Sequence, residues 1–148
     1  MTVRFGMLTG NAVIDCALLA WFLAQLIKVL LELILLRRFE PERFVSSGGM
    51  PSSHSAMVVA CATAIGKLYG IDGPFFALAA VVSAVVMYDA CNVRRSAGDT
   101  ARLVNQILKH VERLTAEDFA EDLKEVMGHT PLQVLMGAIL GLGVGLLV

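Results

Sequence analysis

Long apolar segments constrain this chain more than any other feature of its sequence. Of its 148 residues, 57% are hydrophobic and 17% are charged, whereas soluble domains carry about 25% charged residues. The apolar residues form four segments of about 20 residues, the length that a helix needs to cross a bilayer. These segments cover residues 11–36, 53–69, 74–91 and 131–148. We therefore expect a single all-α membrane domain over residues 1–148, with about four spans packed as a helical bundle.

The connections between the segments refine this picture. Gly70–Pro74 is a compact turn, which predicts that the second and third segments form an antiparallel hairpin. The second and fourth segments are short, so full crossing by both stays an open question. The polar stretch 92–130 has helical periodicity, carried by Leu103, Val104, Ile107, Leu108, Val111 and Leu114. We expect an amphipathic helical region there that lies on the membrane or covers a site, with a second short helix opening at Thr115.

Lysine and arginine are distributed unevenly between the predicted loops. Only Arg4 and Lys67 fall on one side if all four segments cross, and Lys28 lies inside a span. The others fall on the opposite side: Arg37, Arg38, Arg43, Arg94, Arg95, Arg102, Lys109, Arg113 and Lys124. Because cytoplasmic loops are enriched in these residues, we expect a cell-membrane protein with outside termini and cytoplasmic polar loops. The net charge of −1 argues against a nucleic-acid partner.

The stretch from Ser47 to Ala56 is the first candidate for chemistry. It joins Gly48 and Gly49 to Pro51-Ser52-Ser53-His54, directly before the second apolar segment. A glycine-rich turn at a helix start leaves backbone N–H groups for an anion, which the helix dipole also favours. The alternative is that the serine hydroxyls only cap the helix. We predict a phosphate site that uses Gly48, Gly49, Ser52 and Ser53, with His54 beside it.

Charged residues near the same predicted membrane face could complete this site. Arg94 and Arg95 follow the third segment, and an arginine fork matches phosphate oxygens, although such pairs also anchor helix ends at headgroups. Asp89 is a carboxylate inside a span, where it needs a partner. Lys28 lies on a face with Gln25 and Glu32, so it pairs with Glu32, leans toward the phosphate or extends to the membrane interface.

A second histidine stands at the start of the fourth segment, on the same predicted side as His54. His129 precedes Thr130 and Pro131, and Gln133 follows one turn later, where it could fix the imidazole tautomer. A lone histidine at a membrane edge is usually an interfacial residue. With two histidines on one side, one could attack phosphorus while the other protonates the leaving oxygen.

Other residue patterns indicate packing rather than chemistry. Gly137, Gly141 and Gly145 recur every four residues, which allows close helix approach within the chain or between copies in a homo-oligomer. Cys16, Cys61 and Cys91 lie singly in apolar segments and fit neither a metal site nor a disulfide framework. We expect no metal and no cofactor.

The blocks around these residues resemble a known superfamily. Pro51-Ser52-Ser53-His54 is similar to the Pro-Ser-Gly-His motif of the type-two phosphatidic acid phosphatases, which are related to vanadium haloperoxidases. Together with Tyr88–Ala90, Val93–Arg95 and Gly128–Pro131, it resembles the divergent branch of that superfamily over nearly the whole chain. The resemblance implies a helical bundle in which one histidine becomes phosphohistidine.

The same resemblance implies roles for individual residues. His129 would be the nucleophile and His54 the general acid, with Ser53 and the two arginines holding phosphate. The superfamily's lysine–arginine–proline motif has no exact counterpart, since Lys28 and Arg37 are too far apart and Pro41 does not directly follow an arginine. Three single positions also depart from the superfamily pattern. Ser53 replaces a glycine, Gln133 replaces a carboxylate, and Leu123, next to Lys124, replaces an arginine.

We therefore predict a membrane phosphatase that hydrolyses a lipid or prenyl phosphate through a phosphohistidine. The alternative, favoured by the missing carboxylate and arginine, is a non-catalytic protein that binds anionic lipid headgroups or acts as a scaffold. A transporter or channel would also account for Lys28, Glu32 and Asp89 inside spans, but four short spans favour it least.

Overall fold

The computed structural model describes residues 6–36, 49–111 and 128–148, apart from the side chains of 35–36, 94–95 and 108–111. The described residues form five α-helices and no strand, so the protein is all-α as expected. The helices are α1 (Ala12–Leu36), α2 (Ser53–Tyr69), α3 (Pro74–Cys91), α4 (Val93–Val111) and α5 (Pro131–Gly145).

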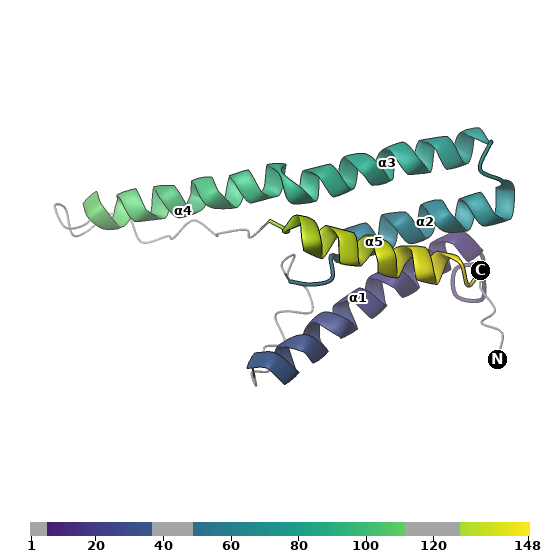
Figure 1. The fold of residues 1–148 in the computed structure, drawn as a ribbon, viewed down its shortest axis with the longest axis horizontal. Helices are drawn as coiled ribbons and strands as arrows, with labels where there is room; N and C mark the ends of the chain where they lie inside the picture. The colour runs from purple at the N-terminus through teal and green to yellow at the C-terminus, as the bar shows by residue number, and fades with distance from the viewer. Residues whose placement is uncertain (1–5, 37–48, 112–127) are drawn as a thin grey trace.

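Three of the helices form the packed part of the bundle. α1, α2 and α5 contact one another, and α3 packs on α2 through the hairpin that the sequence predicts (Figure 1). Small residues fill the centre of this packing, which brings the helix axes close together. They are Cys16, Ala20 and Ala24 of α1, and Ala56, Ala60 and Ala64 of α2, joined by Val144 of α5.

The closest approach is between α2 and α5. A Cβ at Gly137 would overlap the carbonyl oxygen of Ser52, and a Cβ at Gly141 would overlap that of Ala56. Gly145 faces Thr63 in the same way. The glycine stripe therefore packs against α2 within the chain, which is the first of its two interpretations. A homo-oligomer would have to use another surface, and its existence stays a prediction.

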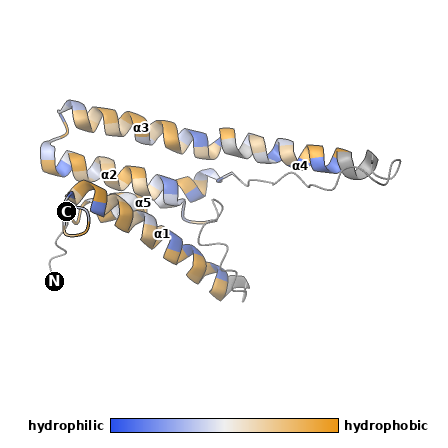
Figure 2. Ribbon diagram, turned by 180° about the vertical axis from the view of Figure 1, so that it is seen from behind, coloured by the Kyte–Doolittle hydropathy of each residue, from blue (hydrophilic) through white to orange (hydrophobic). Residues whose placement is uncertain are grey.

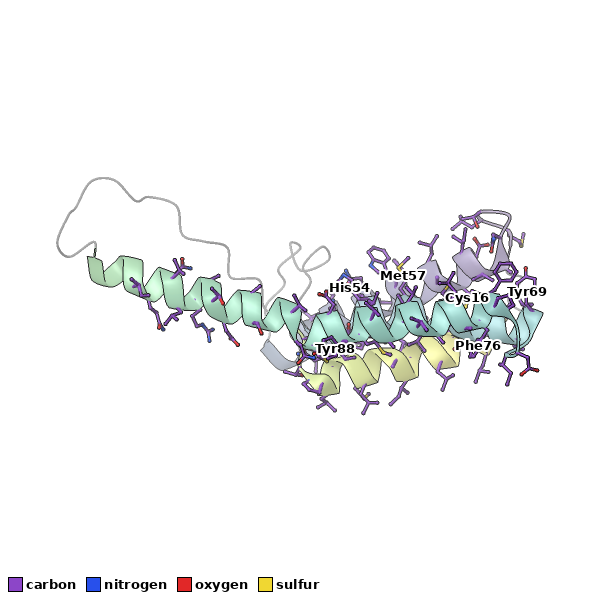
Figure 3. All side chains as sticks on the ribbon, turned by 90° about the horizontal axis from the view of Figure 1, so that it is seen from above. Cys16, His54, Met57, Tyr69, Phe76 and Tyr88 are labelled. Atoms are coloured by element: carbon purple, nitrogen blue, oxygen red, sulfur yellow. The ribbon has the colours of Figure 1, made fainter. Side chains whose placement is uncertain are left out.

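A carboxylate organises the beginning of α1. Asp15 accepts hydrogen bonds from the backbone N–H groups of Gly6, Leu8 and Thr9 and from the Thr9 hydroxyl, at 2.7–3.0 Å. A negative charge in the first turn also interacts favourably with the helix dipole. Asp15 thus folds the preceding loop back onto the helix start. This end of the bundle, which includes Tyr69 and Phe76, lies opposite the end that holds His54 and Tyr88 (Figure 3).

Two stretches of the described helices are long and apolar enough to cross a membrane. They are Ala12–Ile34 and Pro74–Ile107, and Pro131–Gly145 is apolar but shorter. Hydrophobic residues line α1, α3 and α5, whereas α4 alternates between hydrophobic and hydrophilic positions (Figure 2). Crossing by all four predicted segments stays a prediction.

The polar region departs from one expectation. α4 continues from the end of α3 and projects away from the bundle (Figure 1). Among the described helices it contacts only α3, so it does not cover the bundle end as one interpretation required. The reason is that only one residue, Asn92, separates the two helices, too few for the chain to fold back. The second short helix predicted from Thr115 lies outside the described residues.

Candidate functional site

The turn before α2 forms the floor of the candidate site. Gly49 has φ +93°, a conformation that favours glycine, and a cis peptide bond joins Met50 to Pro51. Ser52 is the N-cap of α2, and its Oγ accepts from the N–H of Ser55 at 3.4 Å and from the Ser55 hydroxyl at 3.1 Å. Ser52 is fully buried. Its hydroxyl therefore has the capping function that the sequence offered as the alternative to phosphate binding.

The turn is attached to the start of α5. The N–H of Ser52 donates to the carbonyl oxygen of Gln133 at 2.9 Å, which the absence of a side chain at Gly137 permits. Gln133 also completes a capping box with Thr130, because its side-chain oxygen accepts from the Thr130 N–H at 3.0 Å. The structure thus gives Gln133 a capping function. Its predicted effect on the His129 tautomer stays a prediction.

Lys28 reaches this turn from α1. Its ammonium donates to Gln25 Oε1 at 2.8 Å and to the Ser53 hydroxyl at 3.5 Å, and the side chain is only 4% exposed. A Cβ at Gly49 would lie 3.5 Å from Cδ of Lys28, so the turn rests on the lysine methylene groups. Lys28 therefore leans toward the turn, as one interpretation required, and Glu32 also interacts with its ammonium electrostatically.

The two histidines lie side by side. The ring centroids of His54, in the first turn of α2, and His129, just before α5, are 6.0 Å apart and the rings are tilted by 56°. His129 is 2% exposed, and His54 is half-buried. The backbone N–H of His129 donates to the carbonyl oxygen of Ala90 at 3.0 Å, which fixes His129 against the end of α3. The helices α2, α3 and α5 therefore meet at the two histidines.

The remaining predicted residues stand in three different situations. Asp89 is half-buried and immediately precedes Ala90, so its backbone lies next to the point where His129 is attached. Arg94 and Arg95 lie in the first turn of α4, which begins at Val93, and their side chains are not among those that the structure describes. Gly48, Leu123 and Lys124 also lie outside the described residues. Among the described residues, no cluster of three or more His, Cys, Asp or Glu is arranged to hold a metal ion.

Sequence reasoning missed the contribution of Gln25. It lies one turn before Lys28, which predicts a shared helix face, but that spacing does not say which side chain the ammonium contacts. Gln25 is 4% exposed and accepts the shorter of the two described Lys28 hydrogen bonds. A buried ammonium needs such a partner, because an isolated buried charge is costly. A buried amide one turn from a buried lysine is the signal that could have identified it.

Comparison with known proteins places this arrangement in a family. The model of the Divergent PAP2 family matches residues 9–144, which include every described residue of the candidate site. The chain belongs to the Divergent PAP2 family. It is also similar to the "Uncharacterized membrane protein YuiD" of Bacillus subtilis (strain 168), with 37% identity over 136 residues, which cover 85% of this chain and 86% of that protein. No solved structure matches the chain. It is therefore a PAP2-related membrane protein, as the sequence blocks predicted.

Proposed function

We propose that this member of the Divergent PAP2 family hydrolyses the phosphate ester of a lipid or prenyl substrate through a phosphohistidine on His129. The observation that carries the proposal is the His54–His129 pair, with ring centroids 6.0 Å apart, at the start of the helix whose Ser53 contacts buried Lys28. Ser52 and Thr130 cap the two helices, so capping does not account for the histidine pair.

The pair supports a reaction in two steps. A ring nitrogen of His129 attacks phosphorus, the bond from phosphorus to the lipid oxygen breaks, and His54 donates a proton to that oxygen. Water then attacks the phosphohistidine, His54 accepts the water proton, and the phosphorus–nitrogen bond breaks to release inorganic phosphate. The attack requires an approach to about 3–3.5 Å and the proton transfer about 3 Å. Two adjacent rings can satisfy both if the phosphoryl group lies between their nitrogens.

Charge stabilisation would come from the turn and from α1. The Lys28 ammonium and the Ser53 hydroxyl would contact phosphate oxygens, aided by N–H groups at the start of α2. Gly48 and Gly49 would shape this turn, while Arg94, Arg95 and Asp89 would lie at its α3–α4 side. The excess of lysine and arginine in the polar loops favours a site that faces the cytoplasm.

Purified protein assayed on a panel of prenyl and lipid phosphates tests the proposal. We expect His129→Ala to lower kcat at least about 10³-fold and His54→Ala about 10²- to 10⁴-fold, since proton transfer typically contributes that much. His110→Ala, a matched histidine change in α4, should leave kcat unchanged. Absence of turnover on every substrate, or equal activity of all three variants, would contradict the proposal.

A second candidate function is binding of an anionic lipid headgroup without turnover. The capping functions of Ser52 and Gln133 favour it, because they engage two predicted site residues in the fold. In that case a lipid phosphate would bind with an affinity that depends on Lys28 but not on His129, and no inorganic phosphate would be released.

A further inference from the structure

The exposed helix α4 presents the clearest feature that the proposed function leaves unused. Its apolar residues Val93, Leu103 and Ile107 are more than half exposed, and among the described helices it contacts only α3. At 100° per residue, the apolar residues of α4 fall within an arc of about 160° from Leu103 round to Ala101, which also contains Ser96 and Thr100. Ala101 and Val104 in this arc are half-buried. Arg102 and Gln106 lie on the other side and are exposed. A helix with such a face needs a partner for it.

The position of α4 along the chain limits what that partner can be. α3 has 18 residues, which at about 1.5 Å each span about 27 Å, close to the thickness of the hydrocarbon core. Tyr88, near its end, is 67% exposed, as is typical of tyrosines at the membrane–water interface. α4 therefore begins where the chain leaves the hydrocarbon. If it continued along the α3 axis, its apolar face would lie in water.

The charge of α4 favours lipid over a second copy of the chain. Its sequence has four cationic residues, Arg94, Arg95, Arg102 and Lys109, against the single acidic residue Asp99. Two such helices side by side would repel each other, whereas anionic headgroups would attract each of them. The apolar arc is also wider than the narrow seam of a two-stranded coiled coil.

We infer that α4 is a membrane-surface helix that binds anionic lipid, with its apolar face in the headgroup–acyl boundary. In the structure α4 continues along the α3 axis (Figure 1), so this orientation requires the chain to bend, and we place the bend at Asn92. Asn92 departs from ideal helical angles, with φ −112° and ψ −64°, and its side-chain amide donates to the Tyr88 carbonyl oxygen at 3.4 Å. The backbone hydrogen bonds from Asn92 to Tyr88 and from Ser96 to Asn92 continue through this position. This inference does not depend on phosphatase activity.

Fluorescence quenching in nanodiscs tests the inference. The full chain, with Cys16, Cys61 and Cys91 changed to alanine, receives one cysteine by Leu103→Cys on the apolar face or by Gln106→Cys on the polar face. Each carries a bimane label in nanodiscs of phosphatidylcholine with or without phosphatidylglycerol. With phosphatidylglycerol, a lipid-borne nitroxide should quench the label at 103 several-fold more than the label at 106, and an aqueous quencher should show the reverse order.

Each other outcome overturns part or all of the inference. Equal aqueous quenching at both positions would mean that α4 stands in water. Protection at 103 without quenching by the lipid nitroxide would assign the apolar face to a second copy or to the chain itself, and label–label proximity would identify the second copy. Unchanged depth in pure phosphatidylcholine would overturn the assignment of anionic lipid. Because α4 lies outside the packed bundle, the changes at 103 and 106 should leave folding intact. Cys16 lies in the core, so thermal unfolding of the cysteine-free chain is compared with that of the unchanged chain before labelling.

Discussion

The α2–α5 pair and the α3–α4 rod differ in how closely their helices are packed and in how much apolar surface they expose. Between α2 and α5, glycines and alanines bring the two backbones into direct contact, and both candidate histidines stand at the same end of this pair. Along α3 and α4, large apolar side chains such as Leu78, Val85 and Ile107 are more than half exposed. The first region is closely packed, whereas the second leaves its large apolar side chains available for contacts with its surroundings.

This difference explains where precise chemistry can be placed. A reacting pair has to be held within a fraction of an ångström, which needs rigid support. The turn at Ser52 is tied to α5 through the Gln133 carbonyl, and His129 is tied to α3 through the Ala90 carbonyl. The candidate site therefore depends on the close α2–α5 approach and on the end of α3, which holds His129 in place.

We expect the largest effect on stability from an alanine substitution at one of two neighbouring glycines of α5. Gly141→Ala should destabilise the protein by about 3 kcal/mol, because the new Cβ would overlap the carbonyl oxygen of Ala56 and force the helices apart. Gly143→Ala is the control, since a Cβ there meets nothing within 4 Å. It should be neutral or stabilise by up to about 1 kcal/mol through helix propensity. Thermal unfolding in detergent measures both, and equal midpoints would contradict the α2–α5 packing.

An intermediate effect is expected at the α1 side of the site. Gln25→Leu removes the acceptor of the 2.8 Å hydrogen bond from Lys28, and a hydrogen bond to a charged group contributes about 1.5–3 kcal/mol. If Lys28 binds phosphate, kcat/KM should fall about 10- to 100-fold, and Gln25→Glu should retain more activity because it keeps an acceptor. Leu26→Ala, at an exposed neighbouring position, is the control. Steady-state kinetics that do not distinguish Gln25→Leu from this control would remove Gln25 from the site.

The smallest effect is expected where α3 meets α2. The Ser83 hydroxyl contacts the carbonyl oxygens of Val58 at 3.0 Å and Ala79 at 2.7 Å. Such links between membrane helices average about 0.6 kcal/mol, so Ser83→Ala should lower stability by about that amount. Ser96→Ala, at an exposed position of α4, should change it less. A loss of several kcal/mol at Ser83 would show that α3 is held to the bundle as firmly as α5.

Much of this architecture could be predicted from the sequence, because it follows from short-range chemistry. Apolar length, Pro74, Pro131 and the Ser52 cap locate the starts of α2, α3 and α5. Opposite chain directions in successive segments then placed His54 and His129 at the same end of the bundle. The structure brings their rings together there.

The contacts within the site and the direction of α4 depend on distances between segments, which the spacing of residues along the sequence does not give. Lys28 has a long flexible side chain that could have reached Glu32, the membrane surface or the turn, and only the packed helices select the turn. The Ser52 hydroxyl could bind an anion or cap its own helix, and burial under α5 decides for the cap. The direction of α4 depends on a single residue, Asn92, that periodicity cannot interpret.

Trapping of the phosphorylated enzyme tests the central claim most directly. The protein is mixed with a ³²P-labelled lipid phosphate, quenched in alkali, where phosphohistidine survives, and mapped by peptide mass spectrometry. We expect label on the peptide that contains His129, its loss in His129→Ala and its retention in His110→Ala. Release of inorganic phosphate with no label on His129, or label on another residue, would contradict the proposed function.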